Sequence, residues 1–217
     1  MKQLDKDPAK EKRILVEIPL MNGTKNDIWA RWCSMYAGTD RGYFFVPEIG
    51  DEVLLGFIDD DPCCPVILGG LYSSKLPPPY EMEAENFRKG IVTKEGMKIV
   101  FDEEKKVITF ETPGNNKIEL SDDGKFIRLT DRNRNKMTMD DNGILLSSSG
   151  KITLKAEKDI VIDTVGNVNM TSNRDIVLEG GNVNAKARIG FTAKGNATAE
   201  ISASGQTTIK GGIVMIN

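Results

Sequence analysis

The residues that could do chemistry in this chain are few, and their types restrict that chemistry strongly. The sequence contains no histidine, which removes the commonest general base and the commonest transition-metal ligand together. The three cysteines are Cys33, Cys63 and Cys64, and an odd number with one adjacent pair favours a reduced, cytosol-type origin over a disulfide framework. Catalysis by Ser-His-Asp or Cys-His groups is excluded, and the spacing of the acids points to no carboxylate mechanism. We therefore expect no catalytic residue, no cofactor and no metal site, and predict that the chain is not an enzyme.

Two short stretches could bind ligands, and each has a plainer interpretation. The acidic run DDDP at 59–62 could form a calcium loop, but consecutive acids do not reproduce the alternating ligand positions of such loops, so a solvated turn is predicted. Trp29, Trp32, Tyr36 and Tyr43 could stack bases or sugars. The net charge is −3 with no basic stripe, whereas stacking on nucleic acid works beside a cationic groove. We interpret these aromatic residues as core and inter-subunit packing and expect no nucleic-acid partner.

Residues 1–80 differ in composition from the rest, because they hold 9 of the 14 aromatic residues and 8 of the 9 prolines. Strand-like pieces recur here between Gly, Pro, Asn and Asp clusters, namely RILVEIPL, IWARWCSMYA, YFFVP, DEVLLGFI and PVILGGLY. Five short strands of this kind predict a small barrel or sandwich. The following LPPPYE predicts a stiff, extended linker, because its prolines fix the backbone and donate no hydrogen bond.

Beyond the linker, pairs of apolar residues separated by one residue return at regular steps. The steps are 9 or 10 residues between Ile99 and Met139, and mostly 8 residues from Ile144 onward, as in GKITLKAE KDIVIDTV GNVNMTSN RDIVLEGG at 150–181. Within these octads one step of seven residues crosses Gly180-Gly181, the residues best able to absorb an irregular backbone. Such an internal repeat indicates stacked β units, with an irregular turn expected at the two glycines.

One extended octad covers about 26 Å at roughly 3.3 Å per residue, which is one side of a prism and not a closed coil. Either a single chain uses three octads per turn, or three chains wind about a common threefold axis. We favour three chains, because a single-chain core would be thin and assembly would bury both members of every pair. An ordinary sandwich is the commoner architecture, but its strands vary in length and spacing. The residues predicted to form the core on the trimer axis are Ile144, Leu146, Ile152, Leu154, Ile160, Ile162, Val168, Met170, Ile176, Leu178, Val183, Phe191, Ile201 and Ile209.

Several stretches resemble one known family. DKDPAKEKRILVEIPL, DIWARWCSMYAG, YFFVPEIGDEVLLGFIDDDPCCPVILGGLY and LPPPY are similar to the OB-fold region of VgrG proteins, the spikes of type VI secretion systems related to the central spikes of contractile phage tails. GIVTKEGMKIVFDEE, TPGNNKIELSDDG and the octads resemble the neck and triple-stranded β-helix of the same family, and the ending GGIVMIN is similar to its tip. The resemblance implies an all-β chain: an OB-fold collar at 1–76, a Pro-rich linker at 77–90, a β neck at 91–142, and an octad shaft with its tip at 143–217.

The same resemblance implies a function. It predicts a homotrimeric needle that a contracting sheath pushes through a target membrane, above a hub module and a tube of stacked rings. A PAAR-repeat tip protein and effectors would travel on it, and we expect the tip protein to dock on Ile213, Val214, Met215, Ile216 and Asn217. The needle would assemble in the bacterial cytoplasm and then be expelled outside or into a target cell.

The chain also departs from the family pattern. Family members usually carry a large hub module before the OB-fold, and its absence here suggests a truncated or split spike. The charged start MKQLDKDPAKEKR lacks the apolar centre of a secretory signal peptide. The competing function is a trimeric phage-type tailspike that binds or cleaves surface carbohydrate. Cleavage would need a groove with paired carboxylates, and the outward octad positions show no such cluster.

Overall fold

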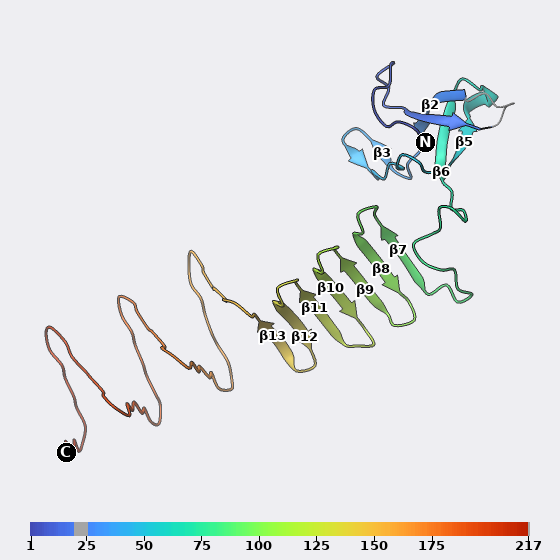
Figure 1. Ribbon diagram of the computed structural model, residues 1–217. Helices are drawn as coiled ribbons and strands as arrows, with labels where there is room; N and C mark the ends of the chain where they lie inside the picture. The colour runs from blue at the N-terminus through green and yellow to red at the C-terminus, as the bar shows by residue number, and fades with distance from the viewer. Residues whose placement is uncertain (20–25, 217) are drawn as a thin grey trace. The chain divides into compact units, whose positions relative to one another are not determined.

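The computed structural model describes residues 1–19 and 26–216 (Figure 1). These residues form strands β1 to β13 and one short 3-10 helix, η1 (Ile58–Asp60), which confirms the predicted all-β class. No helix in the described ranges is long and apolar enough to cross a membrane. The chain divides into two compact units, Met1–Leu154 and Lys155–Asn217, which are described separately below.

The first unit begins with a four-stranded sheet in the order β1-β2-β6-β5. Strand β2 runs parallel to β6, while the β1–β2 and β5–β6 pairs are antiparallel. Alternating residues of β1 and β2 point into a small core of Ile14, Val16, Ala30 and Ile67, because successive side chains of a strand face opposite sides of the sheet. The strands are β1 (Ile14–Ile18), β2 (Asn26–Trp32), β5 (Val53–Phe57) and β6 (Pro65–Gly70).

The expected strand at YFFVP is wrong. Residues 43–47 lie outside any strand, and a minimal hairpin of β3 (Ala37–Gly38) and β4 (Arg41–Gly42) precedes them. The segment is held by other contacts: the Ser34 hydroxyl lies 2.9 Å from the carbonyl oxygen of Tyr43. The ring of Phe44 meets that of Trp32 edge-on at 5.8 Å. Aromatic packing therefore replaces strand pairing here.

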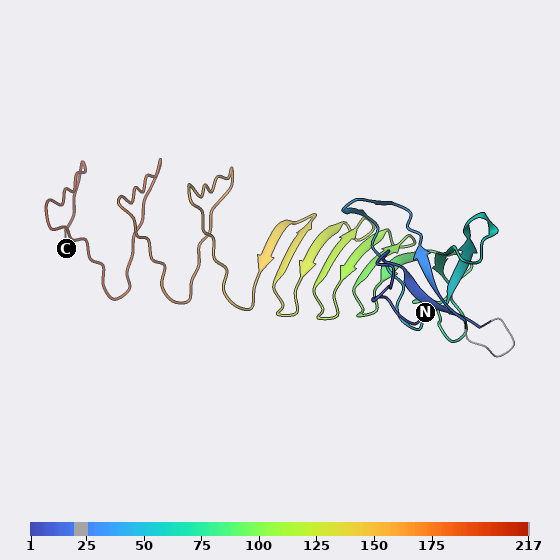
Figure 2. The same cartoon turned by 90° about the horizontal axis from the view of Figure 1, so that it is seen from above.

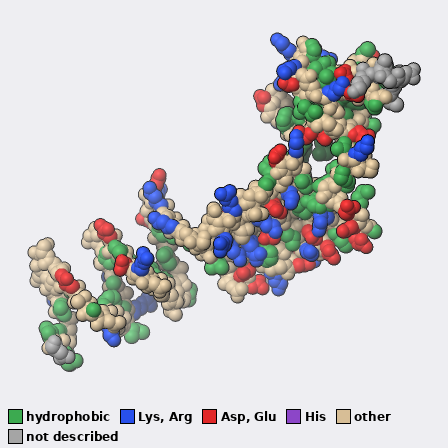
Figure 3. All heavy atoms as spheres, in the orientation of Figure 1, with side chains coloured by type: hydrophobic (Ala, Val, Ile, Leu, Met, Phe, Trp, Pro, Cys, Tyr) green, Lys and Arg blue, Asp and Glu red, His purple; other side chains and the backbone are tan. Residues whose placement is uncertain are grey.

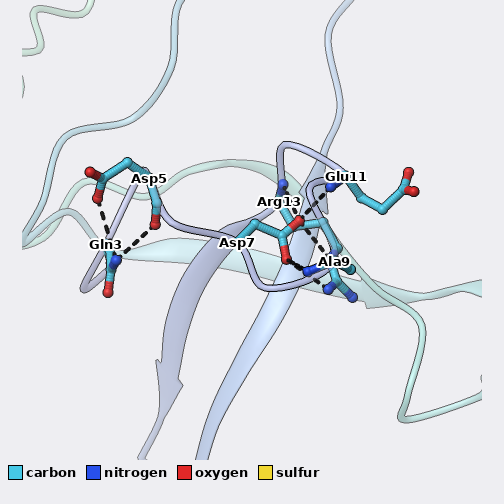
Figure 4. A network of polar contacts seen from close by, with 6 residues as sticks. All are labelled: Gln3, Asp5, Asp7, Ala9, Glu11 and Arg13. Atoms are coloured by element: carbon cyan, nitrogen blue, oxygen red, sulfur yellow. Dashed lines mark hydrogen bonds and ion pairs between the residues drawn. The ribbon is translucent and has the colours of Figure 1, made fainter.

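A loop before β1 is organised around one carboxylate (Figure 4). Asp7 accepts two hydrogen bonds from the Arg13 guanidinium, at 2.8 and 3.1 Å, and further bonds from the backbone N–H groups of Ala9, Glu11 and Arg13. Its side chain is only 5% exposed. The Arg13 guanidinium, together with these N–H groups, holds the pKa of Asp7 well below its ordinary value.

Replacing Asp7 by asparagine should lower the melting temperature of the N-terminal four-stranded domain at pH 7, because asparagine offers one acceptor oxygen and carries no charge. The folded-state pKa of Asp7 is depressed, so its contribution is fully present above about pH 4, the ordinary Asp value, and is lost as the pH falls further. The difference between D7N and the parent should therefore shrink below pH 4.

Tryptophan fluorescence is the readout, since both tryptophans, Trp29 and Trp32, lie in β2. The exposed Asp5→Asn is the control, and equal melting of D7N and parent at pH 7 would contradict the assigned role.

The rest of the first unit is a seven-stranded antiparallel sheet in which each strand pairs with the next along the chain (Figure 1). We call it the neck sheet. Its hairpins are short because each connection holds only two to five residues between strands, as the strand bounds show. The strands are β7 (Arg88–Val92), β8 (Lys98–Asp102), β9 (Val107–Glu111), β10 (Lys117–Ser121), β11 (Phe126–Thr130), β12 (Lys136–Asp140) and β13 (Gly143–Ser147).

The second unit is an extended chain that turns at regular intervals (Figure 2). Bends that begin just ahead of it, at 149–150, recur at 157–158, 165–166, 173–174, 180–181, 188–189, 196–197, 204–205 and 212–213. The interval is therefore eight residues except at Gly180-Gly181, where it is seven. The bends follow the predicted octad, and the shorter step falls at these two glycines, where the bend has the same two-residue length as the others. Each predicted inward pair lies on the straight segment three and five residues after the first residue of a bend.

Candidate assembly surface

The apolar residues of the neck sheet share one face because of strand register. Ile99 lies opposite Phe110, which lies opposite Ile118, and Ile118 lies opposite Leu129. These cross-strand partners align in two parallel rows that run the length of the sheet. The first row is Ile91, Ile99, Phe110, Ile118, Leu129, Met137 and Leu146, and the second is Phe101, Ile108, Leu120, Ile127, Met139 and Ile144. We call the two rows together the apolar face.

The opposite face of the neck sheet is mostly polar and carries several charged contacts. Lys117 lies 2.7 Å from Glu119, and Arg128 lies 3.9 Å from the same carboxylate. The Arg128 guanidinium also sits 4.1 Å from the centre of the Phe126 ring. This alternation of an apolar and a polar face is typical of an antiparallel sheet that packs on one side and is solvated on the other.

In the single chain, however, the apolar face has no packing partner and is exposed to solvent. All seven residues of the first row line a groove of about 680 Å³. Leu146 is 54% exposed and Ile144 is 73% exposed, whereas Thr138 on the polar face is only 4% exposed. An apolar surface this continuous marks an interaction site, because monomeric proteins rarely expose one.

The apolar pairs continue through the second unit. Hydrophobic side chains are open to view along residues 155–216 (Figure 3). Among residues 148–216 no strand is formed and no backbone-to-backbone hydrogen bond is made within the chain. Backbone N–H and C=O groups need partners wherever they are removed from water. We call residues 148–216 the tail. The tail therefore has both apolar side chains and backbone groups available for another chain.

The structure places the predicted axis and tip residues in three different settings. Ile144 and Leu146 end the two rows of the neck sheet, and the other twelve predicted axis residues lie on the straight segments of the tail. Of the predicted tip, Ile213, Met215 and Ile216 are almost fully exposed and Val214 is half exposed. Asn217 lies outside the described residues.

The remaining candidates lie in the N-terminal four-stranded domain. The acidic run at 59–62 overlaps η1, and Asp61 accepts a 2.8 Å hydrogen bond from the N–H of Cys63. This N–H, followed by the Cys64 thiol, lowers the pKa of Asp61. The three cysteines are exposed and unpaired with one another. Trp32 packs on Phe44, while Tyr36 and Tyr43 stay about half exposed.

Two features of this surface were missed from sequence. The axis residues were predicted only from Ile144 onward, although the apolar face starts at Ile91 in β7; the paired apolar positions spaced by 9 and 10 residues were the available signal. The charged connections along the two sides of the neck sheet were also overlooked. Their signal was the different charge of alternate loops, such as DDGK at 122–125 and DRNRN at 131–135.

Comparison with known proteins gives the class of the first domain. Residues 2–72 match the family described as the type VI secretion system/phage-baseplate injector OB domain. This range contains β1 to β6, including the core strands and the Asp7 loop. The N-terminal third of the chain is therefore an injector OB domain.

Curated relatives narrow the class to one kind of protein. The chain is 38% identical over 64 residues to the type VI secretion system spike protein VgrG4b of Pseudomonas aeruginosa, covering 30% of the chain and 8% of that protein. It is 35% identical over 63 residues to VgrG1a and 30% identical over 87 residues to VgrG2a of the same organism, covering 29% and 38% of the chain. Each match covers 10% of the relative. The N-terminal part of the chain is thus similar to VgrG-type spike proteins, and the chain spans only about a tenth of the length of the curated relatives it matches.

Proposed function

We propose that the chain forms a non-enzymatic homotrimeric spike of a contractile injection apparatus. The observation that carries the proposal is the recurrence of one apolar pattern in both units of the chain. Two rows of apolar residues cross every strand from β8 to β13 in register, and the same two-residue pattern then recurs on each straight segment of the tail. A pattern that recurs in both units is suited to burial on an axis shared by several copies.

The dimensions of the neck sheet fit three copies. A strand of five residues is about 17 Å long, and three such strands around a threefold axis form a triangle whose sides lie about 5 Å from its centre. That distance matches the reach of an isoleucine, leucine or methionine side chain. Each strand presents two inward residues, so three chains would place six apolar side chains at every level. Each large side chain removed from water in this way contributes about 2 kcal/mol.

The proposed action is mechanical. A dry apolar axis, surrounded by paired strands from three chains, would make a stiff rod that transmits force from outside. The spike proteins that the chain matches belong to type VI secretion, which supports delivery out of the cell that builds it. On this proposal a hub and tube rings lie behind the OB domain, and a PAAR-repeat tip protein with effectors is carried at the C-terminal end towards the target membrane.

Deleting residues 213–217 should abolish co-purification of the tip protein, because these residues form the proposed docking end. Their side chains are apolar and exposed in the described part, at 213–216, so the free end offers both apolar contact and unpaired backbone groups. The trimer itself should persist, since the axis residues from Ile144 to Ile209 remain. Unchanged capture of the tip protein by the deleted form would contradict docking at this end.

Molar mass in solution tests the assembly directly. The chain has a mass of 23.9 kDa, and light scattering coupled to size exclusion should give about three times that value. A mass of one chain would refute the proposal. A mass of two chains would also refute it, because two neck sheets packed face to face at about 10 Å form a sandwich and not a needle.

A further inference from the structure

The neck sheet has two long sides, and the connections between strands alternate between them. Side one carries the connections at 103–106, 122–125 and 141–142, and side two carries those at 93–97, 112–116 and 131–135. This follows from the antiparallel order of strands, since each hairpin reverses the chain. Connections on the two sides are therefore staggered by one strand, which is about 4.8 Å along the sheet.

The two sides carry opposite charge. With the flanking strand ends included, side one has seven acidic residues against four basic ones, and side two has six basic residues against three acidic ones. The acids of side one are Asp102, Glu103, Glu104, Asp122, Asp123, Asp140 and Asp141, against Arg88, Lys105, Lys106 and Lys125. The bases of side two are Lys94, Lys98, Lys117, Arg132, Arg134 and Lys136, against Glu95, Glu111 and Asp131.

The connections of side two are built alike and are held rigidly. In each, the side-chain oxygen of the first residue accepts a hydrogen bond from the backbone N–H of the fifth, from Met97 to Thr93, from Asn116 to Thr112 and from Asn135 to Asp131. Their lengths are 3.1, 3.3 and 2.9 Å. Asn135 also donates through its side chain to Asp131 at 2.7 Å, and these bonds lower the pKa of Asp131. Asp131 is thus engaged within its own connection.

The arginines of the same connection are not engaged in this way. Among the described residues, neither the Arg132 nor the Arg134 guanidinium makes an ion pair within the chain. On side one, Asp123 is paired with Lys106 at 3.1 Å, whereas the carboxylates of Asp122 and Asp141 have no cation within the described chain. Two free arginines therefore stand on side two, and two free carboxylates stand on side one, where Lys105 and Lys125 are also without an ion pair in the described chain.

We propose that side two of one copy meets side one of the next, with Arg132 and Arg134 placed between the acidic connections 122–125 and 140–142 of its neighbour. The proposal rests on the trimer proposed above. When three sheets turn their apolar faces to a threefold axis, every corner joins a side one to a side two, whichever way the chains are ordered around the ring. Copies related by pure rotation lie at the same height, so connection 131–135, which joins β11 to β12, falls between connections that join β10 to β11 and β12 to β13.

This contact has a defined role. The apolar face holds the sheets together without specifying their relative height, because hydrophobic burial is not directional. Charge pairs at the corners would favour one height, since Arg132 and Arg134 lie between two acidic connections of the neighbour only when the copies are level, and a shift of one strand would leave them facing a single connection. Electrostatic complementarity of this kind commonly fixes register and excludes wrong pairings.

Cysteine cross-linking in the full chain tests the contact. In a background with Cys33, Cys63 and Cys64 replaced by serine, Arg132→Cys combined with Asp141→Cys or with Asp122→Cys should yield a covalent trimer on oxidation, visible on a non-reducing gel. The two positions lie on opposite sides of one sheet, about 17 Å apart, too far for a disulfide within one chain. Arg132→Cys with Glu104→Cys is the mismatched control and should give no covalent trimer, because Glu104 lies about three strands away along the axis.

The charges are tested separately. Arg132→Glu with Arg134→Glu should reduce the trimeric fraction at low ionic strength, and adding Asp122→Arg with Asp141→Arg should restore it. If the protein without its native cysteines is trimeric but neither matched pair forms cross-links, the corner contact is wrong and the proposed trimer stands. Cross-linking without any effect of charge reversal would overturn the role of the charges. A background protein that is not a trimer would overturn the proposed function itself.

Discussion

Replacing Ile160 by aspartate should leave the protein as a single chain of 23.9 kDa. Ile160 lies on a straight segment of the tail and is 55% exposed in the isolated chain. In the proposed trimer the substitution would put three carboxylates at one level of a dry axis. Removing an unpaired charge from water costs several kcal/mol for each ion, and three like charges at close range add repulsion.

Its neighbour provides a matched control. Val161 is 81% exposed and points to the opposite face of the same segment, because successive side chains of an extended strand alternate. Val161→Asp should therefore remain trimeric, with a mass of about three times 23.9 kDa by light scattering. The register would be wrong if Ile160→Asp stayed trimeric, or if Val161→Asp disrupted assembly as strongly. Partial recovery of Ile160→Asp below pH 5 is also expected, because burial raises the pKa of a carboxyl group and favours its neutral form.

Replacing Leu129 by glutamate should disrupt assembly from the neck. Leu129 lies in the first row of the apolar face, opposite Ile118 on one side and Met137 on the other. Threefold symmetry would again bring three charges to one level, beside the three copies of Ile127. Loss of assembly by this variant would show that the neck sheet buries its apolar face in the assembly, which substitutions in residues 148–216 cannot establish.

The adjacent residue again supplies the control. Thr130 faces the polar side of the sheet and lies between Lys117 and Lys136 in the strand register. Thr130→Glu would therefore place a carboxylate between two cations, and cross-strand pairs of opposite charge stabilise a sheet by about 0.2–1 kcal/mol. A trimer of undiminished thermal stability is expected for Thr130→Glu. If both variants assembled equally well, the apolar face would not be the buried one.

The spacing of apolar residues determined much of this protein by itself. The octad, the seven-residue step at Gly180-Gly181 and the all-β class could all be predicted, because the bends of an extended chain recur with the sequence period and depend on neighbouring residues alone. The paired positions from Ile99 to Met139 were also visible in the sequence. Their steps of 9 and 10 residues are the length of one strand plus one connection.

Other features depended on contacts between distant residues. The YFFVP stretch has the composition of a strand, yet the packing of Phe44 on Trp32 and the hydrogen bond from Ser34 hold it outside the sheet. Five hydrogen bonds gather on Asp7 from residues two to six positions away, and the short stretch around it contains no motif that predicts this arrangement. The conformations of these two segments depend on local packing and hydrogen bonding, which the spacing of apolar residues does not reveal.

The two charged sides of the neck sheet show the difference most clearly. Along the chain, acidic and basic residues of 102–141 alternate in short clusters, so their sum is close to neutral and suggests an ordinary solvated surface. Folding into hairpins reverses the chain at every connection and sends alternate clusters to opposite sides. Only the tertiary structure therefore separates Asp122 and Asp141 from Arg132 and Arg134, because the physical separation of these charges arises from the antiparallel register and not from their order in the sequence.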